Sequence, residues 1–252
     1  MKVCWISAGV SSFIAGYLGN ADKYIYIDVA DQHPDSIRFI KDCEKALGKE
    51  IEILKNNEFL NTSEVFRSRN FIVSPYGAPC TQTLKKYVRK QWERQYIKDN
   101  GIDEYFNLVY IWGFDCDEKN RAERLIKNFP DIKHEFPLID KNLNKNAVHG
   151  FFNNNFNFKR PVMYDLGYQN NNCIGCVKGG MGYWNKIRKD FPEVFKERSI
   201  LEREIGHSIL KEYFLDELPL DKGNISKEIM PDCDILCYLA SMESVENEKS
   251  KC

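Results

Sequence analysis

The sequence predicts an α/β protein: a mainly parallel sheet of about five strands flanked by helices, with a helical, cysteine-bearing C-terminal part. Two observations lead to this fold class. Short apolar runs of strand length recur along the first half of the chain, and stretches with helical spacing lie between them. The expected strands are residues 3–6, 24–29, 51–54, 71–73 and 108–112.

The expected helices are recognised by their apolar spacing and by the residues that begin or end them. The first follows the first strand, with Ser11 or Ser12 placed to cap it. In residues 35–47 the pattern ends at a glycine, and in residues 83–96 four apolar side chains repeat at intervals of four. Further helices are expected at residues 118–129, 183–189 and 192–209.

The composition changes near residue 140, where asparagine-rich stretches begin. These stretches, at residues 142–146, 153–157 and 170–172, are typical of loops. We therefore expect three parts: an α/β core over residues 1–140, a cysteine-bearing loop and helical part over 141–240, and a mobile polar tail over 241–252.

The composition also limits the class of protein. A chain of 252 residues with 43% hydrophobic residues can form a large core, and its net charge of -1 argues against bulk electrostatic capture of nucleic acid. No apolar run reaches transmembrane length, and a strand begins at once where a signal peptide would lie. We expect a cytoplasmic protein with no membrane partner.

Nine cysteines in such a protein indicate core filling, metal binding or redox chemistry rather than a disulfide framework. Cys4 and Cys43 fall within strand and helix patterns, so we expect them in the core. The other cysteines include the candidates for chemistry.

Residues 7–12, Ser-Ala-Gly-Val-Ser-Ser, form a turn of small residues between the first strand and the first helix. Such a turn can bind an anion, because backbone N–H groups and hydroxyls point at it and the helix dipole favours negative charge. Ser7, Gly9, Ser11 and Ser12 are the expected contacts, and we expect Gly9 to need a backbone geometry that a side chain forbids. An ordinary turn without a ligand is the alternative.

Two further turns fall at the same edge of the expected sheet, where ligands of parallel sheets bind. After the second strand, Asp28, His33 and Asp35 could hold a ribose hydroxyl, an adenine edge or a magnesium ion. The alternative is a loop in which Asp35 caps the next helix. After the late strand, Arg121 is a candidate phosphate or sulfate contact, or a surface charge paired with Glu118.

The strongest chemical motif is Cys173-Ile174-Gly175-Cys176. Two thiolates separated by two residues can bind one metal centre from a single turn. Cys80 is the third candidate ligand, because the helix that follows it favours a thiolate. Cys237, or else Cys233, is the fourth. An iron–sulfur cluster is the favoured centre, and a zinc site, a redox dithiol or unrelated buried thiols are the alternatives.

A basic run lies on the helix expected at residues 83–96. We interpret it as a solvated face of that helix, with Lys85 as the member that contacts an anion, since it lies in the first turn beside Cys80. The run comprises Lys85, Lys86, Arg89, Lys90 and Arg94.

Taken in order over residues 1–180, these segments resemble the phosphoadenosine phosphosulfate (PAPS) reductase family of the adenine nucleotide alpha-hydrolase (PP-loop) superfamily. Residues 7–12 resemble its pyrophosphate loop, Ser-Gly-Gly-x-Asp-Ser, and residues 26–36 resemble its Asp-Thr-Gly-x-x-Phe-Pro-Glu-Thr segment. Residues 80–85 resemble its Cys-x-x-x-Leu-Lys segment. Residues 137–139 resemble its Pro-Leu-x-x-Trp, and residues 164–176 its Tyr-x-x-Gly-Tyr…Gly-Cys ending.

The chain departs from this family at several positions. Ala8 and Ser11 replace a glycine and an aspartate of the loop, and Asp115 stands where the reductases carry the arginine of Gly-x-Arg. An acidic group there would repel a sulfate, which favours ATP. Pro79-Cys80 replaces the Cys-Cys pair of adenylylsulfate reductases, and the Glu-Cys-Gly-Leu-His ending of the thioredoxin-dependent enzymes has no good match. The cysteine pattern instead resembles the cluster-bearing branch that includes the DNA phosphorothioation proteins, with iron–sulfur tRNA thiolases as a more distant parallel.

The resemblance implies an enzyme that binds ATP or a phosphosulfate and carries out sulfur transfer or reduction at Cys80 and a 4Fe–4S cluster, assisted by Lys85 and Arg121. In a reductive form, a thiolate attacks the sulfur of a nucleotide sulfate. In a thiolation form, ATP activates an oxygen of a nucleic-acid or protein acceptor, and sulfur displaces the adenylate. Mg²⁺ and a homodimer are compatible with both forms. The alternative is a catalytically degenerate nucleotide-binding protein: a sponge, a sensor or an interaction module.

Overall fold

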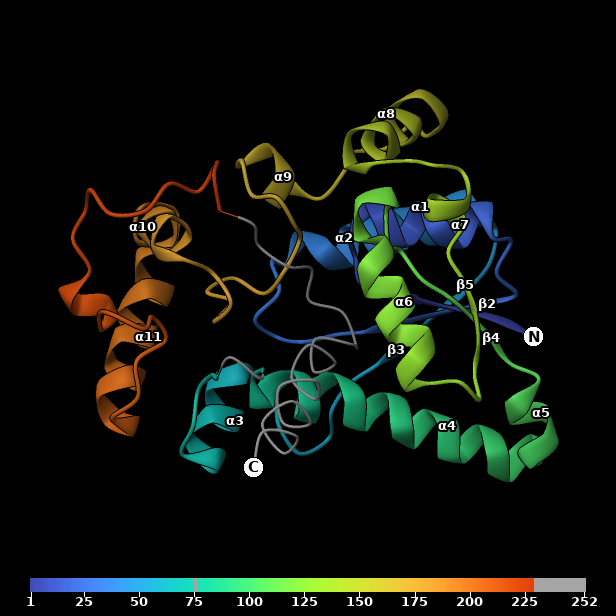
Figure 1. Cartoon of the computed structure of the whole chain (residues 1–252), viewed down its shortest axis with the longest axis horizontal. Helices are drawn as coiled ribbons and strands as arrows, with labels where there is room; N and C mark the ends of the chain where they lie inside the picture. The colour runs from blue at the N-terminus through green and yellow to red at the C-terminus, as the bar shows by residue number, and fades with distance from the viewer. Residues whose placement is uncertain (75–76, 229–252) are drawn as a thin grey trace, which may run out of the picture. The chain divides into compact units, whose positions relative to one another are not determined.

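The computed structural model describes residues 1–74 and 77–228 (Figure 1). The candidate ligands Cys233 and Cys237 and the tail expected at 241–252 lie outside the described residues. The chain divides into two compact units, which we call unit 1 and unit 2. Unit 1 comprises Met1–Asp28, Pro34–Lys55 and Val88–Asn171, and unit 2 comprises Val29–His33, Asn56–Tyr87 and the chain from Asn172 onward.

Unit 1 contains a five-stranded sheet in which all neighbouring strands are parallel, which confirms the predicted α/β fold class. The strand order is β3-β2-β1-β4-β5, so the first strand of the chain is the central one. Four of its five residues are buried, as its apolar sequence predicts. The strands are β1 (Lys2–Ile6), β2 (Lys23–Ile27), β3 (Ile51–Leu54), β4 (Val109–Ile111) and β5 (Lys133–Glu135).

One expected strand does not form, and one observed strand lacks the apolar pattern from which a strand is predicted. Residues 71–73 lie outside the sheet: Ile72 is fully buried, and the ring of Phe71 lies 4.9 Å from that of His207 within unit 2. Ile72 therefore packs in the interior of unit 2, whereas Phe71 and Val73 are half-buried. The fifth strand is instead β5, Lys-His-Glu, an edge strand whose charged residues give no apolar run.

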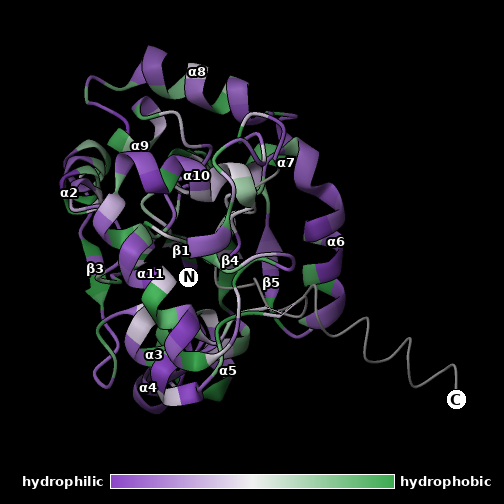
Figure 2. Cartoon of the chain, turned by 90° about the vertical axis from the view of Figure 1, so that its left-hand side faces the viewer, coloured by the Kyte–Doolittle hydropathy of each residue, from purple (hydrophilic) through white to green (hydrophobic). Residues whose placement is uncertain are grey.

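Four helices of unit 1, α1, α2, α4 and α6, lie where the sequence predicts a helix, and the other four, α5, α7, α8 and α9, lie where it predicts none. The second helix, α2, has the predicted bounds, residues 35–47, because Gly48 ends it in the left-handed conformation at φ 60°. Figure 2 shows α6 as largely hydrophilic, and its buried residues are Ala122 and Leu125. The helices are α1 (Val10–Leu18), α2 (Asp35–Leu47), α4 (Tyr87–Asn100, in this unit from Val88), α5 (Ile102–Phe106), α6 (Lys119–Asn128), α7 (Pro137–Asp140), α8 (Lys145–Asn155) and α9 (Val162–Asp165).

The asparagine-rich stretches are not all loops, so that prediction is wrong for α8. Asn144 accepts a hydrogen bond from the Ala147 N–H at 2.9 Å and so caps this helix. Residues 153–155 then form its last turn. Asparagine at a helix start is a capping residue as well as a loop residue, and composition alone does not separate the two roles.

The core that packs against α1 in unit 1 is rich in aromatic rings. Phe13 is fully buried, and its ring contacts those of Phe39, Phe152, Phe156 and Phe158 at centroid distances of 6.1, 6.0, 4.8 and 5.7 Å. These partners come from α2, from α8 and from the segment that follows α8. The position of α1, and hence of the turn before it, is therefore set by a large buried cluster.

The regular secondary structure described in unit 2 is helical. The helix expected at residues 83–96 is divided: a π-helix, Thr81–Lys86, precedes α4. The last helix ends earlier than expected, because Gly206 takes the left-handed conformation at φ 72°. The other helices of this unit are α3 (Thr62–Arg69), α10 (Met181–Asp190), α11 (Pro192–Ile205) and a 3-10 turn, Leu215–Glu217.

Across the described helices of both units, length and apolar content fall short of what crossing a lipid bilayer requires.

Candidate functional site

The serine turn, residues 7–12, joins the carboxyl end of β1 to the start of α1. Gly9 precedes the helix in an extended conformation (φ -102°, ψ 155°), and no side chain caps it. The prediction that Ser11 or Ser12 caps α1 is therefore wrong, since both residues lie in its first turn. The first N–H groups of a helix have no partner within the helix, so this turn offers backbone donors at the carboxyl edge of the sheet.

Ser12 gives the turn its shape. Its Oγ accepts a hydrogen bond from the Ser7 N–H and donates one to the Gly9 carbonyl, both at 3.0 Å. The two hydroxyl oxygens of Ser7 and Ser12 are 3.1 Å apart. The two serines thus close the turn by contacts within it, and Ser12 acts in shaping the turn as well as being a candidate ligand contact.

Backbone strain in the turn lies at Ala8, contrary to the expectation for Gly9. Ala8 has φ 58°, a left-handed conformation that residues with a side chain rarely adopt. A glycine takes this conformation without strain, whereas an alanine does not. A Cβ on Gly9 would lie 3.2 Å from the Tyr164 hydroxyl and 3.4 Å from the Ser7 hydroxyl, a tight fit in an ordinary conformation.

Tyr164 and Asn171 contact the turn from distant parts of the sequence. The Val10 N–H donates to the Tyr164 hydroxyl at 3.4 Å. The buried Asn171 side chain donates through Nδ2 to the Ala8 carbonyl at 2.8 Å, and its Oδ1 has no hydrogen-bond partner among the described residues. Sequence reasoning did not select either residue; the only available indication was Tyr164's place in the family-like Tyr-x-x-Gly-Tyr segment.

His149 lies against Tyr164, with ring centroids 4.7 Å apart. Burial lowers the pKa of His149 to about 4, and the cations Arg160 and Lys145 act in the same direction. The imidazole is therefore neutral at physiological pH. It adds no positive charge to the surroundings of the serine turn.

The carboxyl end of β4 passes close to the serine turn. A Cβ on Gly113 would lie 2.7 Å from Ser12 Cα, so a glycine is needed there. Asp115 then caps the turn at residues 116–118, where it accepts the Asp117 N–H at 2.9 Å while Glu118 accepts the Asp115 N–H at 3.3 Å. The buried Asp115 carboxylate thus has a structural role.

Arg121 forms an ion pair with Glu118, one of the two roles expected for it from the sequence. Its guanidinium is 2.6 Å from Glu118 and lies over the Phe114 ring at 4.5 Å from the ring centroid. These contacts hold the side chain beside the residues that follow β4. A role in binding phosphate or sulfate remains a proposal.

The acidic residues expected after β2 are engaged in ion pairs. Asp28 pairs with Lys55 at 2.9 Å. Asp35 is the first residue of α2 and does not cap it; its carboxylate pairs with Arg38 at 2.7 Å and accepts the Val162 N–H at 2.9 Å. His33 belongs to unit 2, where its ring contacts that of Phe191 at 6.2 Å.

In unit 2 the structure brings two of the predicted cysteines together. Cys173 is buried in a small apolar cluster with Val29, Val65 and Leu84, and Cys80 packs against the same cluster. Cys176 is also buried, at 8% exposure. Cys80 and Cys173 are far apart in the sequence, so their meeting is a product of the tertiary structure.

The backbone of the cysteine loop, residues 173–176, is held by other parts of unit 2. The Ile174 N–H donates to the Asp31 carbonyl at 2.8 Å. The Tyr183 hydroxyl accepts the Cys176 N–H at 2.9 Å and donates to the Cys173 carbonyl at 3.4 Å. Gly175 has φ 71°, and a Cβ there would lie 2.7 Å from Val194 on α11.

The thiols provide the soft sulfur ligands that an iron–sulfur cluster requires, and the cysteine loop carries two of them. Within residues 1–74 and 77–228, however, no three cysteine, histidine or acidic side chains are grouped so that they could hold a metal ion. The thiols are suitable ligands for a cluster, but among the described residues Cys80 and Cys173 pack against the same apolar side chains without a third ligand close enough to complete a site.

The basic run on the helix after Cys80 is partly buried, so its interpretation as a solvated face is wrong for Lys85, Lys86 and Arg89. Arg89 pairs with Glu93 at 3.0 Å, and the same carboxylate accepts the Tyr110 hydroxyl at 2.8 Å. Lys85, on the π-helix, is 7% exposed. π-helical turns are frequent at functional sites, and such a site would suit Lys85 as an anion contact.

Cys4 and Cys43 are fully buried in the core of unit 1, as expected. Burial raises the pKa of the Cys4 thiol to about 12, and it raises the pKa of Cys43 as well. Both thiols are therefore protonated and unreactive at neutral pH.

Comparisons with protein-family models, with curated proteins and with solved structures each find nothing that matches the chain.

Proposed function

We propose that this chain is an enzyme of the PAPS reductase family that binds an adenine nucleotide at the serine turn and carries out sulfur chemistry at Cys80, Cys173 and Cys176. The observation that carries the proposal is the packing of Cys80 and Cys173 against one cluster. Cys80 and the cysteine motif at residues 173–176, which are far apart in the sequence, are thereby brought together in unit 2.

The nucleotide part of the proposal is supported by the geometry of the serine turn. The N-terminus of α1 follows the central strand, and its dipole favours the negative charge of a di- or triphosphate. The left-handed Ala8 and the contacts of Ser12 fix the turn before a ligand binds. A preformed turn loses little conformational entropy when a phosphate occupies it.

Cys80, Cys173 and Cys176 are the proposed ligands of an iron–sulfur cluster, which would supply either an electron or an iron site that carries sulfur. The chain's own contribution is to bury the cysteines and hold their loop. Cys173 and Cys176 are 7% and 8% exposed, which limits access of water and oxidants. Lys85, buried on the π-helix after Cys80, is the proposed anion contact.

Of the two reactions, we favour the ATP-dependent thiolation over reduction of a phosphosulfate. Asp115 occupies the position of the family's sulfate-binding arginine, and it is buried and fixed as a cap. A fixed carboxylate repels a sulfate group at that position.

The direct test is to incubate the anaerobically purified protein with ATP or with phosphosulfate and with sulfur acceptors of each class. Thiolation releases pyrophosphate from ATP, and reduction releases sulfite from phosphosulfate. Tight binding with complete recovery of both nucleotides, and no product with any acceptor, would reject the enzyme and leave the degenerate nucleotide-binding protein.

The nucleotide site is tested separately with Gly9→Val and a matched control, Gly150→Val. A side chain on Gly9 points at Tyr164 and Ser7, whereas a Cβ on Gly150 meets nothing within 4 Å. We expect a loss of affinity of about tenfold or more for Gly9→Val only, equivalent to about 1.4 kcal/mol. Unchanged affinity in Gly9→Val would remove the phosphate-binding role of the turn.

The metal site is tested by iron and sulfide analysis of alanine variants of Cys80, Cys173 and Cys176, with Cys116→Ala as the control. Cys116 is half-buried in unit 1. We expect loss of iron in the first three variants and full iron in the control. Full iron in Cys80→Ala would contradict the shared site, and zinc in place of iron would identify a structural centre.

A further inference from the structure

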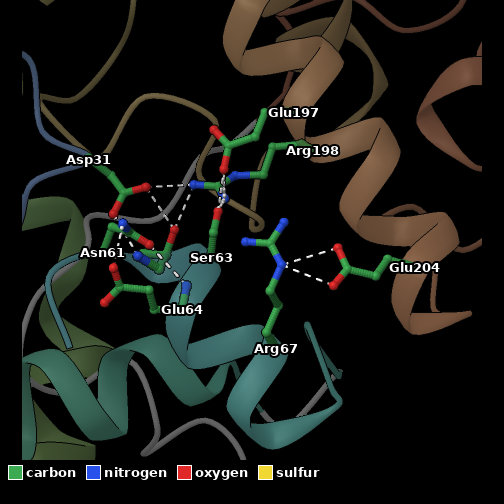
Figure 3. Close-up of polar contacts among 9 residues, drawn as sticks. Asp31, Asn61, Ser63, Glu64, Arg67, Glu197, Arg198 and Glu204 are labelled. Atoms are coloured by element: carbon green, nitrogen blue, oxygen red, sulfur yellow. Dashed lines mark hydrogen bonds and ion pairs between the residues drawn. The ribbon is translucent and has the colours of Figure 1, made fainter. Parts of the chain in front are cut away.

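Arg198 is one of the largest fully buried side chains of unit 2, and its guanidinium faces two carboxylates, Asp31 and the exposed Glu197 at 3.7 Å (Figure 3). From α11 it reaches Asp31, with Nη2 2.6 Å from the Asp31 carboxylate. Its side chain is 1% exposed and that of Asp31 is 9% exposed. A buried ion pair of this kind is strongly disrupted when one partner is removed, because the other charge is left uncompensated.

The pair is part of a larger polar network at the start of α3. Arg198 Nη2 also donates to the Thr62 hydroxyl at 2.6 Å, and Arg198 Nη1 donates to the Ser63 hydroxyl. The Asp31 carboxylate accepts both the N–H and the hydroxyl of Thr62, at 2.7 and 2.9 Å. Ser63 in turn donates to Glu197 at 2.6 Å. Asp31 is therefore held from two helices and has little freedom to move.

Asp31 is also the residue whose backbone holds the cysteine loop. Its carbonyl accepts the Ile174 N–H, the amide between the two cysteines of the motif, at 2.8 Å. Gly175 lies near Arg198, since a Cβ on Gly175 would be 3.6 Å from Arg198 Cγ, after closer approaches to Val194 and Trp184. The guanidinium thus fixes Asp31 while the aliphatic part of the same side chain lies against the loop.

A second arginine joins the same two helices without these contacts. Arg67 of α3 pairs with Glu204 of α11 at 3.0 Å, but both side chains are nearly half exposed (Figure 3). Exposed pairs contribute little to stability. This pair touches neither Asp31 nor the cysteine loop, so it is a matched control for the buried one.

We propose that Arg198, acting through Asp31, is the positioning residue that holds the cysteine loop in place and so keeps Cys173 and Cys176 buried. This inference deepens the proposed function, on which it rests, by assigning the residues that orient the two ligands. Residues behind metal ligands commonly set the orientation of those ligands. Neither Arg198 nor Asp31 would itself touch the metal or the substrate.

The test measures access to each cysteine in the reduced, metal-free full chain. Iodoacetamide modification of Cys173, Cys176, Cys80 and Cys43 is followed over time by mass spectrometry in the parent, Arg198→Met, Arg198→Lys and Arg67→Gln. We expect Cys173 and Cys176 to react at least about fivefold faster in Arg198→Met, because the loop opens locally. Arg198→Lys, which keeps a charge opposite Asp31, should show a smaller increase, and Arg67→Gln should show none.

Selectivity separates positioning from a general loss of stability. General loosening of unit 2 would speed modification of Cys80 as much as that of Cys173 and Cys176, and unfolding would also expose Cys43, which is fully buried. Parent-like rates at Cys173 and Cys176 in folded Arg198→Met, or equal acceleration at Cys80, would overturn the inference. If Arg198→Met does not fold, the same comparison with Arg198→Lys decides.

The outcome is independent of the proposed metal centre. If the parent binds no iron but Arg198→Met shows selective acceleration, the positioning role is retained and the cluster is lost. If the parent binds iron but Arg198→Met shows no acceleration, the cluster is retained and the role of Arg198 is lost.

Discussion

The serine turn of unit 1 and the cysteine loop of unit 2 are both short stretches of small residues, but different contacts hold them. The serine turn is closed mainly by its own members: Ser12 bonds to Ser7 and to Gly9. The cysteine loop depends on partners far away in the sequence, with Asp31 and Tyr183 holding its backbone. The first loop is thus largely a local structure and the second a tertiary one.

This difference has a consequence for stability and for function. The hydrogen bonds of Ser12 join neighbours in the chain and should persist when distant residues change, although Tyr164 and Asn171 add two contacts from farther away. A loop held by distant partners changes when any of them is removed, and such loops open more readily than the core around them. We therefore expect the cysteine loop to be the more sensitive of the two to substitutions in its surroundings.

The largest effect is expected for Gly175→Ala. The left-handed conformation at φ 71° and a Cβ only 2.7 Å from Val194 together should lower the free energy of unfolding by about 2–4 kcal/mol. Gly9→Ala, in an extended conformation with contacts of 3.2 Å or more, should lower it by less than about 1 kcal/mol. Urea denaturation measures both. Equal losses would contradict the contrast between the loops.

A pH effect is expected from Glu202, a carboxyl of unit 2 that accepts the N–H groups of Ile209 and Leu215. Burial raises its pKa from 4.5 to about 7, so folding favours the protonated form. Its contribution to stability is complete below pH 4.5 and is lost as the pH rises towards 7.

Glu202→Gln cannot ionise, so the difference in unfolding free energy between variant and parent should change by about 1–3 kcal/mol across this window. Denaturation at a series of pH values measures it. A constant difference between Glu202→Gln and the parent would show that the carboxyl does not titrate there.

A smaller effect is expected for Tyr183→Phe. Without the hydroxyl, the buried Cys176 N–H loses its acceptor, which should lower the free energy of unfolding by about 1–2 kcal/mol. Tyr213→Phe, which removes a hydroxyl from a half-buried tyrosine elsewhere in unit 2, is a suitable control. Equal stability of Tyr183→Phe and the parent would mean that the hydroxyl does not hold the loop.

The smallest effect is expected for Tyr164→Phe at the serine turn. Its 3.4 Å hydrogen bond with the Val10 N–H is long, so the fold should change by less than about 0.5 kcal/mol. Release of that N–H should tighten nucleotide binding by about twofold, as measured by calorimetry. Weaker binding would instead indicate that the hydroxyl contacts the nucleotide.

Some parts of this protein follow from the sequence by itself, because their cause is local. The bounds of α2 follow from its apolar spacing and from Gly48 at its end. The central position of β1 in a parallel sheet agrees with a strand that is apolar from Val3 to Ile6 and is followed by a helix. The turn after β1 is recognisable because a strand, small residues and a helix are consecutive.

Other parts were decided by the tertiary structure. The charged β5 pairs with the edge of β4, whereas the apolar residues 71–73 stay outside the sheet and Ile72 is buried in unit 2. Burial of Lys85 and the ion pair between Arg198 and Asp31 are contacts between segments that no periodicity links. A local pattern records which residues prefer burial or a helix, but the partner of a buried charge or of a loop amide is chosen by the packing of distant segments.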